Sequence, residues 1–178
     1  MAKICAPGKP RILCLHGFRT SAAILETQIR KWPESILEKL DLVFLDARYP
    51  SAGKSSVEGI FDPPYYEWFQ FQVHQGVALT KVPKIKFVII ISGAKAGGAK
   101  YTAPKLAANA FAAPIKCPSL HFIGEQDFQK TEGLALIDSF VDPLVIHHPK
   151  AHTVPRLDDQ SVKIAQNFVE KILNLATT

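Results

Sequence analysis

Near its start the chain reads Arg11-Ile12-Leu13-Cys14-Leu15-His16-Gly17-Phe18, a short apolar run that ends in a His-Gly turn. A helix-like stretch follows from Ala22. A strand that ends in His-Gly and turns into a helix points backbone N–H groups at one place, which is how an oxyanion hole is built. We therefore expect a strand, a turn and a helix here, with Phe18 in an oxyanion hole and His16 in the pocket beside it.

Two later apolar runs each end just before a residue type that hydrolytic enzymes use. Ser119–Gly124 precedes Asp127, and Leu144–His148 precedes His152. In α/β-hydrolases the catalytic triad runs serine, aspartate, histidine, and each stands on a loop at the carboxyl end of a strand. Asp127 and His152 are thus the candidate catalytic acid and base. The alternative is that Asp127 caps the following helix while His152 is an ordinary loop histidine.

The serine that should precede this pair is missing. No serine of the chain stands in the G-x-S-x-G sequence of a nucleophile elbow. Ser92 is the best geometric substitute because it follows a strand and precedes Gly93, but Ile90 and Ala94 occupy the two glycine positions that permit the strained turn. Without a serine hydroxyl His152 has no proton to remove, so we expect no ordinary esterase turnover.

Short apolar runs alternate with helix-like stretches along the chain. We expect strands at 11–16, 42–46, 87–92, 118–123 and 143–148, mostly without polar alternation, as in parallel strands that are covered on both faces. This alternation predicts an α/β fold with a doubly wound, mostly parallel sheet. The length of 178 residues and a hydrophobic content of 47% suit a single domain.

Two helices can be placed from their apolar spacing. Between Ala22 and Leu40, apolar residues recur at helical intervals, and Pro33 should break that helix after Trp32. A closing amphipathic helix is expected at 162–172.

Residues 47–86 contain no convincing strand and read as a long surface loop that walls a pocket. The aromatic residues of this loop are the candidate pocket residues, namely Tyr65, Tyr66, Trp68 and Phe69. The equally favoured alternative is that they only cover the sheet, since aromatic side chains dominate both cores and pockets.

Composition argues against several classes of partner. The net charge of +5 comes from scattered lysines and arginines, so nucleic-acid binding is disfavoured. There is no apolar leader or membrane-length segment, which favours a cytoplasmic location, with the nucleus as an alternative. The three cysteines lack metal-site spacing, and zinc binding by His147, His148 and His152 is disfavoured because adjacent strand residues point to opposite faces. We expect no cofactor and no metal, and the oligomeric state stays open.

Four strings of the sequence resemble the FSH (family of serine hydrolases) proteins, most closely the plant-type members, in order along nearly the whole chain. They are Lys9–Ser21, Leu42–Ala47, Gly59–Phe69 and His148–Arg156. The resemblance implies an α/β-hydrolase fold and carboxylesterase-like cleavage of a small-molecule acyl ester or thioester. Two residues depart from the family pattern: Ala151 replaces a glycine before the histidine, and Arg48 stands where proline is common.

The resemblance also implies where the nucleophile belongs. The family carries a G-F-S-Q-G elbow between the aromatic loop and the strand within Val82–Gly93, whereas here Phe71 is followed almost directly by Gln75. We therefore interpret 1–178 as one serine hydrolase domain that is internally truncated near residues 71–75. The missing elbow strand and its helix would be central, between the 11–16 and 87–92 strands.

Two classes of function remain. The first is a serine hydrolase that is inactive as written because its nucleophile is absent. The second is a non-catalytic binding or regulatory isoform, or an unstable product of splicing or of a faulty gene model.

Overall fold

The computed structural model describes residues 8–68, 85–95 and 111–176. The chain divides into two compact units, Met1–Gln75 and Gly76–Thr178. The junction near 71–75 lies outside the described residues, so a single, internally truncated domain stays a prediction.

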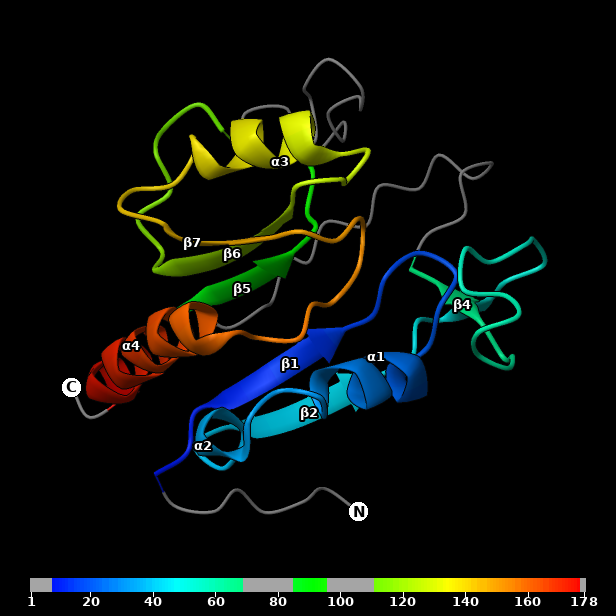
Figure 1. Ribbon diagram of the computed structural model, residues 1–178, viewed down its shortest axis with the longest axis horizontal. Helices are drawn as coiled ribbons and strands as arrows, with labels where there is room; N and C mark the ends of the chain where they lie inside the picture. Colours follow the sequence, from blue (N-terminus) through cyan, green and yellow to red (C-terminus); the bar gives the residue numbers. More distant parts are fainter. Residues whose placement is uncertain (1–7, 69–84, 96–110, 177–178) are drawn as a thin grey trace. The chain divides into compact units, whose positions relative to one another are not determined.

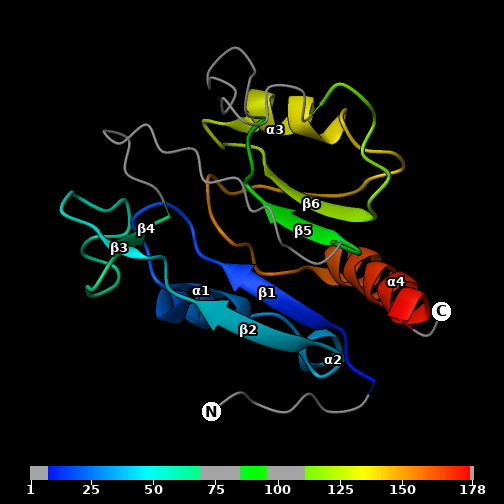
Figure 2. The same ribbon diagram turned by 180° about the vertical axis from the view of Figure 1, so that it is seen from behind.

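The first unit is built on a strand–helix–strand crossover. It contains β1 (Arg11–Leu15), α1 (Ala22–Ile29), α2 (Glu34–Leu37) and β2 (Asp41–Leu45). The two strands are parallel, with Arg11 opposite Asp41 and Leu15 opposite Leu45. Parallel neighbours cannot be joined by a tight hairpin, and here the two helices supply the crossover on one side of the pair (Figures 1 and 2).

The apolar stripe expected between Ala22 and Leu40 is buried. Its members are Ile24, Ile29, Trp32, Ile36 and Leu40. The expected break at Pro33 is confirmed, but α1 ends at Ile29 rather than at Trp32. The reason is local, because a proline in a helix clashes with the carbonyl of the residue four before it, which is Ile29 here. The peptide N–H of Trp32 instead donates to the Ile29 carbonyl at 2.9 Å in a tight turn.

The expectation of no strand within 47–86 is wrong at two places. β3 (Tyr49–Pro50) and β4 (Tyr66–Glu67) form a two-residue antiparallel ladder, with Tyr49 opposite Glu67. Pairs this short leave no periodic pattern in the sequence, which is why the apolar spacing did not reveal them.

The second unit contains a three-stranded parallel sheet. Its strands β5 (Val88–Ile91), β6 (Ser119–Gly124) and β7 (Leu144–His148) lie in that order, and every residue of the central strand β6 is buried. Helices α3 (Lys130–Ile137) and α4 (Asp159–Ala176) lie on opposite sides of this sheet (Figures 1 and 2). The predicted α/β class with mostly parallel strands is confirmed.

Helix α4 is longer than the expected 162–172 and closes the core of this unit. Ala165, Phe168, Val169 and Ile172 are buried on its inner face, and Phe168 meets Phe87 edge to face with ring centroids 6.2 Å apart. Asp158 precedes the helix and accepts the Ser161 N–H at 2.8 Å, and this backbone hydrogen bond lowers the pKa of the Asp158 carboxyl.

Candidate active site

Asp127 and His152, the candidate acid and base, meet in the second unit. The Nδ1 atom of His152 lies 3.0 Å and 3.1 Å from the two carboxylate oxygens of Asp127. The Asp127 side chain is 3% exposed, whereas that of His152 is 42% exposed. A carboxylate accepts here, so Nδ1–H is the donor, which leaves Nε2 as the acceptor in the neutral imidazole. This is the arrangement of an oriented general base, although the catalytic role of both residues stays a prediction.

The same aspartate also organises the start of α3. Its Oδ1 accepts the Gln129 N–H at 2.8 Å, and its carbonyl accepts the Lys130 N–H at 3.0 Å. The N-cap position itself is Gln129, whose side chain makes no capping bond. Asp127 thus holds both the turn before the helix and the histidine, and its catalytic role stays a prediction.

The loop that carries His152 is held against the end of β6 by main-chain contacts. Glu125 N–H donates to the His148 carbonyl at 2.9 Å, and Gln126 N–H donates to the Lys150 carbonyl at 3.3 Å. Gly124 makes this approach possible, because a Cβ there would lie 2.5 Å from the Ala151 carbonyl oxygen. We did not single out Gly124 from the sequence. The available signal was a glycine inside a strand, which often marks a close backbone approach.

Ala151 does not disturb this loop. The non-glycine residues with positive φ among those described are Arg19, Ser92 and Asp142, so Ala151 has a backbone conformation open to any residue. The departure from the family glycine is therefore compatible with the Asp127–His152 contact.

Residues next to the pair in the sequence make further contacts. The exposed ring of Phe128 lies 5.0 Å from that of His152, centroid to centroid. Glu125 accepts from Lys130 Nζ at 2.5 Å and contacts His147 Nδ1 at 2.8 Å. The Lys130 and His147 hydrogen bonds, in that order, lower the pKa of Glu125. These contacts brace the short connection between β6 and α3.

His148 is buried, and neither of its ring nitrogens has a hydrogen-bond partner. Burial lowers its pKa, against the opposing effect of the Asp127 charge. The three histidines weighed as zinc ligands therefore have separate environments, with His147 on Glu125 and His152 on Asp127. Within residues 8–68, 85–95 and 111–176, no group of three or more His, Cys, Asp or Glu is placed to hold a metal ion.

The His-Gly turn of the first unit is tied down through His16. The His16 ring is buried, its Nδ1 faces the Gly17 carbonyl at 2.8 Å, and its Nε2 accepts the Ala47 N–H at 3.0 Å. These contacts link the ends of β1 and β2. The Trp68 ring lies tilted against the His16 ring, with centroids 5.0 Å apart, and its indole N–H donates to the His16 carbonyl at 2.8 Å.

The remaining candidates of this unit surround that turn. The Phe18 ring is 46% exposed and lies under the Arg19 guanidinium, 4.7 Å from its centroid. Tyr66 lies 6.4 Å from His16, ring to ring, and Tyr65 donates its hydroxyl to the Phe61 carbonyl at 2.6 Å. Phe69 lies outside the described residues. The oxyanion role of Phe18 and the pocket roles of the aromatic residues stay predictions.

Ser92 stands at the carboxyl end of β5 with a positive φ of 52°. Its hydroxyl is buried without a hydrogen-bond partner, and its peptide N–H donates to the Phe122 carbonyl at 3.1 Å. Among the described residues, the polar partner of His152 is Asp127 and no serine hydroxyl reaches it.

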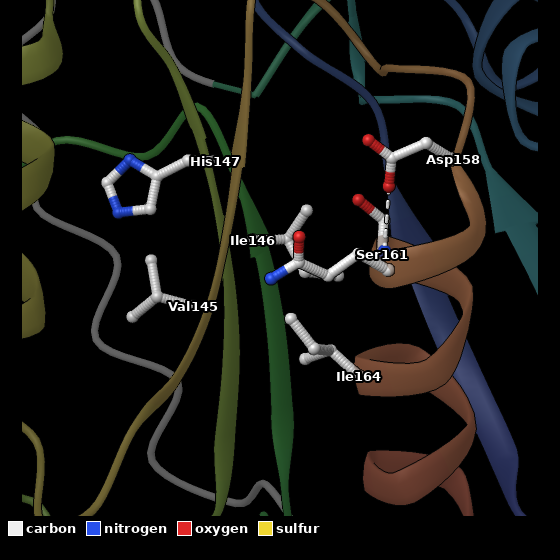
Figure 3. Close-up of a pocket in the computed structure, with 7 residues that line it drawn as sticks. Val145, Ile146, His147, Asp158, Ser161 and Ile164 are labelled. Atoms are coloured by element: carbon white, nitrogen blue, oxygen red, sulfur yellow. Dashed lines mark hydrogen bonds between the residues drawn. The ribbon is translucent and has the colours of Figure 1, made fainter.

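The second unit also holds a small pocket of about 160 Å³ between β7 and the start of α4, shown in Figure 3. It is lined by Val145, Ile146, His147, Asp158, Gln160, Ser161 and Ile164. Neither Asp127 nor His152 lines it, so this pocket is distinct from the predicted catalytic pair.

Two cysteines are described and both are free thiols. Burial raises the pKa of Cys14 to about 11 and also raises that of Cys117, so neither forms a thiolate readily. No helix in the described part of the chain combines the length and the apolar character needed to cross a membrane.

The sequence of this chain is similar to those of several known proteins. Esterase mlcF of Penicillium citrinum is 37% identical over 84 residues, which cover 45% of this chain and 33% of the esterase. Esterase AGAP003155 of Anopheles gambiae is 22% identical over 208 residues, covering 87% of this chain and 76% of that protein. The dihydromonacolin L-[lovastatin nonaketide synthase] thioesterase of Aspergillus terreus is 33% identical over 61 residues, covering 33% of this chain and 24% of the thioesterase.

The chain thus spans about a third of the length of the fungal esterase and about three quarters of the mosquito esterase. No solved structure matches the chain significantly. The sequence profile of the serine hydrolase (FSH1) family matches residues 6–80 and 71–164, which is most of the chain. Because this match covers well over half of its length, the chain belongs to the serine hydrolase (FSH1) family.

Proposed function

We propose that this chain is a serine hydrolase relative that keeps the acid–base pair for acyl ester or thioester cleavage but lacks the nucleophile, so that it is not an active esterase as written. The observation that carries the proposal is the contact of His152 Nδ1 with the buried Asp127 carboxylate at 3.0 Å, in a chain that has no G-x-S-x-G sequence. The pair has the geometry of an oriented base, and within the ranges that the structure describes no serine hydroxyl lies against it.

Two features of the comparisons support a missing internal segment. The family profile matches in two stretches, 6–80 and 71–164, that meet around the junction inferred from the sequence. The alignment with the mosquito esterase covers 87% of this 178-residue chain, or about 155 residues, so about 53 of its 208 positions have no residue of this chain opposite them. Taken as one block, that many positions would be long enough for a strand, an elbow and a helix.

The chemical consequence is large. Removing a triad serine costs about 10⁶ in kcat in subtilisin, the protease from which that value comes. Loss of the elbow also removes the N–H that follows the serine, which is one of the two oxyanion donors in α/β-hydrolases. The remaining base has then neither a nucleophile to activate nor a complete site for the developing negative charge.

The test is hydrolysis of p-nitrophenyl butyrate together with labelling by a fluorophosphonate. We expect the turnover of the purified chain to equal that of its His152→Ala variant, and we expect no labelled peptide. The Ser92→Ala variant is the matched control, because Ser92 is the serine best placed at a strand end. Turnover that depends on His152, or a label that maps to Ser92, would overturn the proposal.

The alternative is a non-catalytic binding role, and the uncovered side of the β1–β2 pair favours it. Leu13 and Leu15 are each 55% exposed, and Leu45 is 45% exposed. Apolar side chains grouped on one surface are a common feature of interaction sites. A stable monomeric chain without esterase activity that binds no other protein would argue against this alternative.

A further inference from the structure

Arg19, immediately after the candidate oxyanion residue Phe18, has an unusual backbone conformation. Its φ is 54°, in the left-handed region that glycine adopts readily and other residues rarely do. Such a conformation persists only when surrounding contacts enforce it. The contacts made by Arg19 identify what enforces it.

Two of the three guanidinium nitrogens of Arg19 donate hydrogen bonds to this part of the chain. Its Nε donates to Glu67 Oε1 at 2.7 Å, and its Nη1 donates to the Lys54 carbonyl at 3.2 Å. The Glu67 side chain is 10% exposed, and the same oxygen accepts the Ser51 hydroxyl at 3.0 Å. A buried carboxylate that accepts two hydrogen bonds is a firm anchor, because leaving it unpaired would be costly.

Gly53 leaves the space that the guanidinium occupies. A Cβ at this position would lie 2.2 Å from Nη1 and 2.4 Å from Cζ of Arg19. The guanidinium therefore lies directly against the Gly53 main chain, and any larger residue would displace it. The φ of Gly53 is not in the left-handed region, so the glycine is needed for space rather than for backbone freedom.

The same loop also holds the main chain at Arg19 and Thr20. Ser55 donates its hydroxyl to the Arg19 carbonyl at 2.6 Å, and the Tyr66 N–H donates to the Thr20 carbonyl at 2.7 Å. The Phe18 ring lies under the Arg19 guanidinium. The turn is thus held against the loop of residues 51–67 through Arg19 and Thr20.

We propose that Arg19 is a positioning residue: its ion pair with Glu67, seated against Gly53, holds the His16–Thr20 turn in the conformation that sets the direction of the Phe18 N–H. The functional meaning rests on the proposed hydrolase ancestry, in which that N–H is an oxyanion donor. A lysine would not replace the arginine, because a single ammonium group cannot reproduce the planar fork that reaches Glu67 and the Lys54 carbonyl together.

The Gly53→Ala variant tests this proposal without altering Arg19 or Glu67. The readout is the ¹H–¹⁵N resonance of Phe18 and the hydrogen-exchange rate of its amide in the purified chain. We expect the resonance to move and the exchange rate to rise about tenfold, as for a turn that opens locally. In an Arg19→Ala background the same glycine substitution should add no further change, because the displaced group is already gone.

Three further variants complete the experiment. Lys54→Ala is the matched control, since only the main-chain carbonyl of Lys54 is used, and the Phe18 amide should not change. Arg19→Lys should shift the Phe18 amide resonance, because lysine does not replace the arginine. Glu67→Gln removes the charged partner of Arg19 and should reproduce the Phe18 shift seen in Gly53→Ala. It provides the same test if the Gly53→Ala variant folds poorly.

Two results would overturn the proposal. One is an unchanged Phe18 amide in both Gly53→Ala and Glu67→Gln. The other is an equal effect of Gly53→Ala with and without the Arg19 side chain, which would assign the change to the loop itself. No substrate is used in this experiment, so its failure is distinguishable from the appearance of esterase activity, which would contradict the proposed function instead.

Discussion

Gly124 is the residue on which the approach of the His152 loop to β6 depends. The Ala151 and Lys150 carbonyl oxygens would lie 2.5 Å and 2.6 Å from a Cβ at this position. Both are main-chain atoms, so they cannot move aside as a flexible side chain would. A glycine here therefore places the loop and indirectly the Asp127–His152 contact.

Gly124→Ala should displace the loop and break the Asp127–His152 hydrogen bond. Overpacking of this kind costs about 1–3 kcal/mol, so we expect a lower melting temperature together with a changed His152 Nδ1 resonance. Gly17→Ala is the matched control, because the nearest atom to its Cβ would be at an ordinary 3.9 Å. An unchanged His152 resonance in Gly124→Ala would show that the loop does not rely on this glycine.

His121 is a second residue whose surroundings decide its chemistry. It is buried in the middle of β6, its Nε2 has no hydrogen-bond partner, and its ring meets Phe140 edge to face at 4.9 Å. Burial lowers the pKa of His121 from 6.5 to about 4. The folded state therefore holds this histidine neutral.

Stability should fall with acid because of His121. As the pH falls, His121 is protonated in the unfolded chain before it is protonated in the folded chain. The contribution of His121 to the free energy of unfolding is therefore complete above pH 6.5 and is lost as the pH falls toward about 4, with no further loss below that. The full shift corresponds to about 3 kcal/mol. Urea unfolding at several pH values should show that the free energy of unfolding falls less with acid in His121→Leu than in the original chain. An equal dependence on pH in both proteins would contradict the assignment. His148 acts in the same direction and remains in both proteins.

At the level of elements, α1 begins through two contacts that come from different parts of the chain. Ser21 is the N-cap, and its hydroxyl accepts the Ile24 N–H at 3.3 Å. Asp46, just beyond β2, accepts the Ala22 N–H at 2.8 Å. The helix start is thereby joined to the strand with which β1 pairs, so capping and sheet formation support each other.

Ser21→Ala should destabilise the first unit by about 1 kcal/mol, the usual cost of losing an N-cap side chain. The measurement is thermal or urea unfolding followed by the fluorescence of Trp32 and Trp68. Ser56→Ala is the control, because Ser56 is exposed and lies outside any helix. A loss of the same size in both variants would mean that the cap at Ser21 contributes little.

At the level of the whole molecule, the β1–β2 pair has helices on one side and exposed leucines on the other. Parallel sheets are normally covered on both faces. The exposed Leu13 and Leu15 are therefore positions where a further element of the complete family fold would be expected to pack. This agrees with the inferred absence of the elbow strand and its helix.

Inserting the family's elbow segment between Phe71 and Gln75 should raise the melting temperature and reduce binding of a hydrophobic dye. Each buried leucine contributes about 1.5–3 kcal/mol. The double variant Leu13→Ser and Leu15→Ser should leave the melting temperature of the present chain nearly unchanged and lower that of the restored protein. A restored protein that melts no higher would show that the sheet needs no such segment, and a stable non-catalytic role would then be favoured.

The positions of the main strands and of the candidate pair were readable from local patterns. Each of the five strands begins and ends within one residue of the expected range, because an apolar run of that length is itself the signal. Asp127 and His152 were readable for a related reason, since each follows such a run. The family resemblance added their order and pointed to the absent serine.

Other features depend on contacts between residues that are distant in the sequence, and no local pattern contains them. Three contacts arise only when the loop folds back on the turn. They are the pairing of Tyr66 with Pro50, the ion pair of Arg19 with Glu67 across 48 positions, and the approach of the Arg19 guanidinium to Gly53. The same holds for Gly124 and the Ala151 carbonyl. Apolar periodicity records which side chains leave water, whereas close packing is settled by the shapes of the elements after they meet.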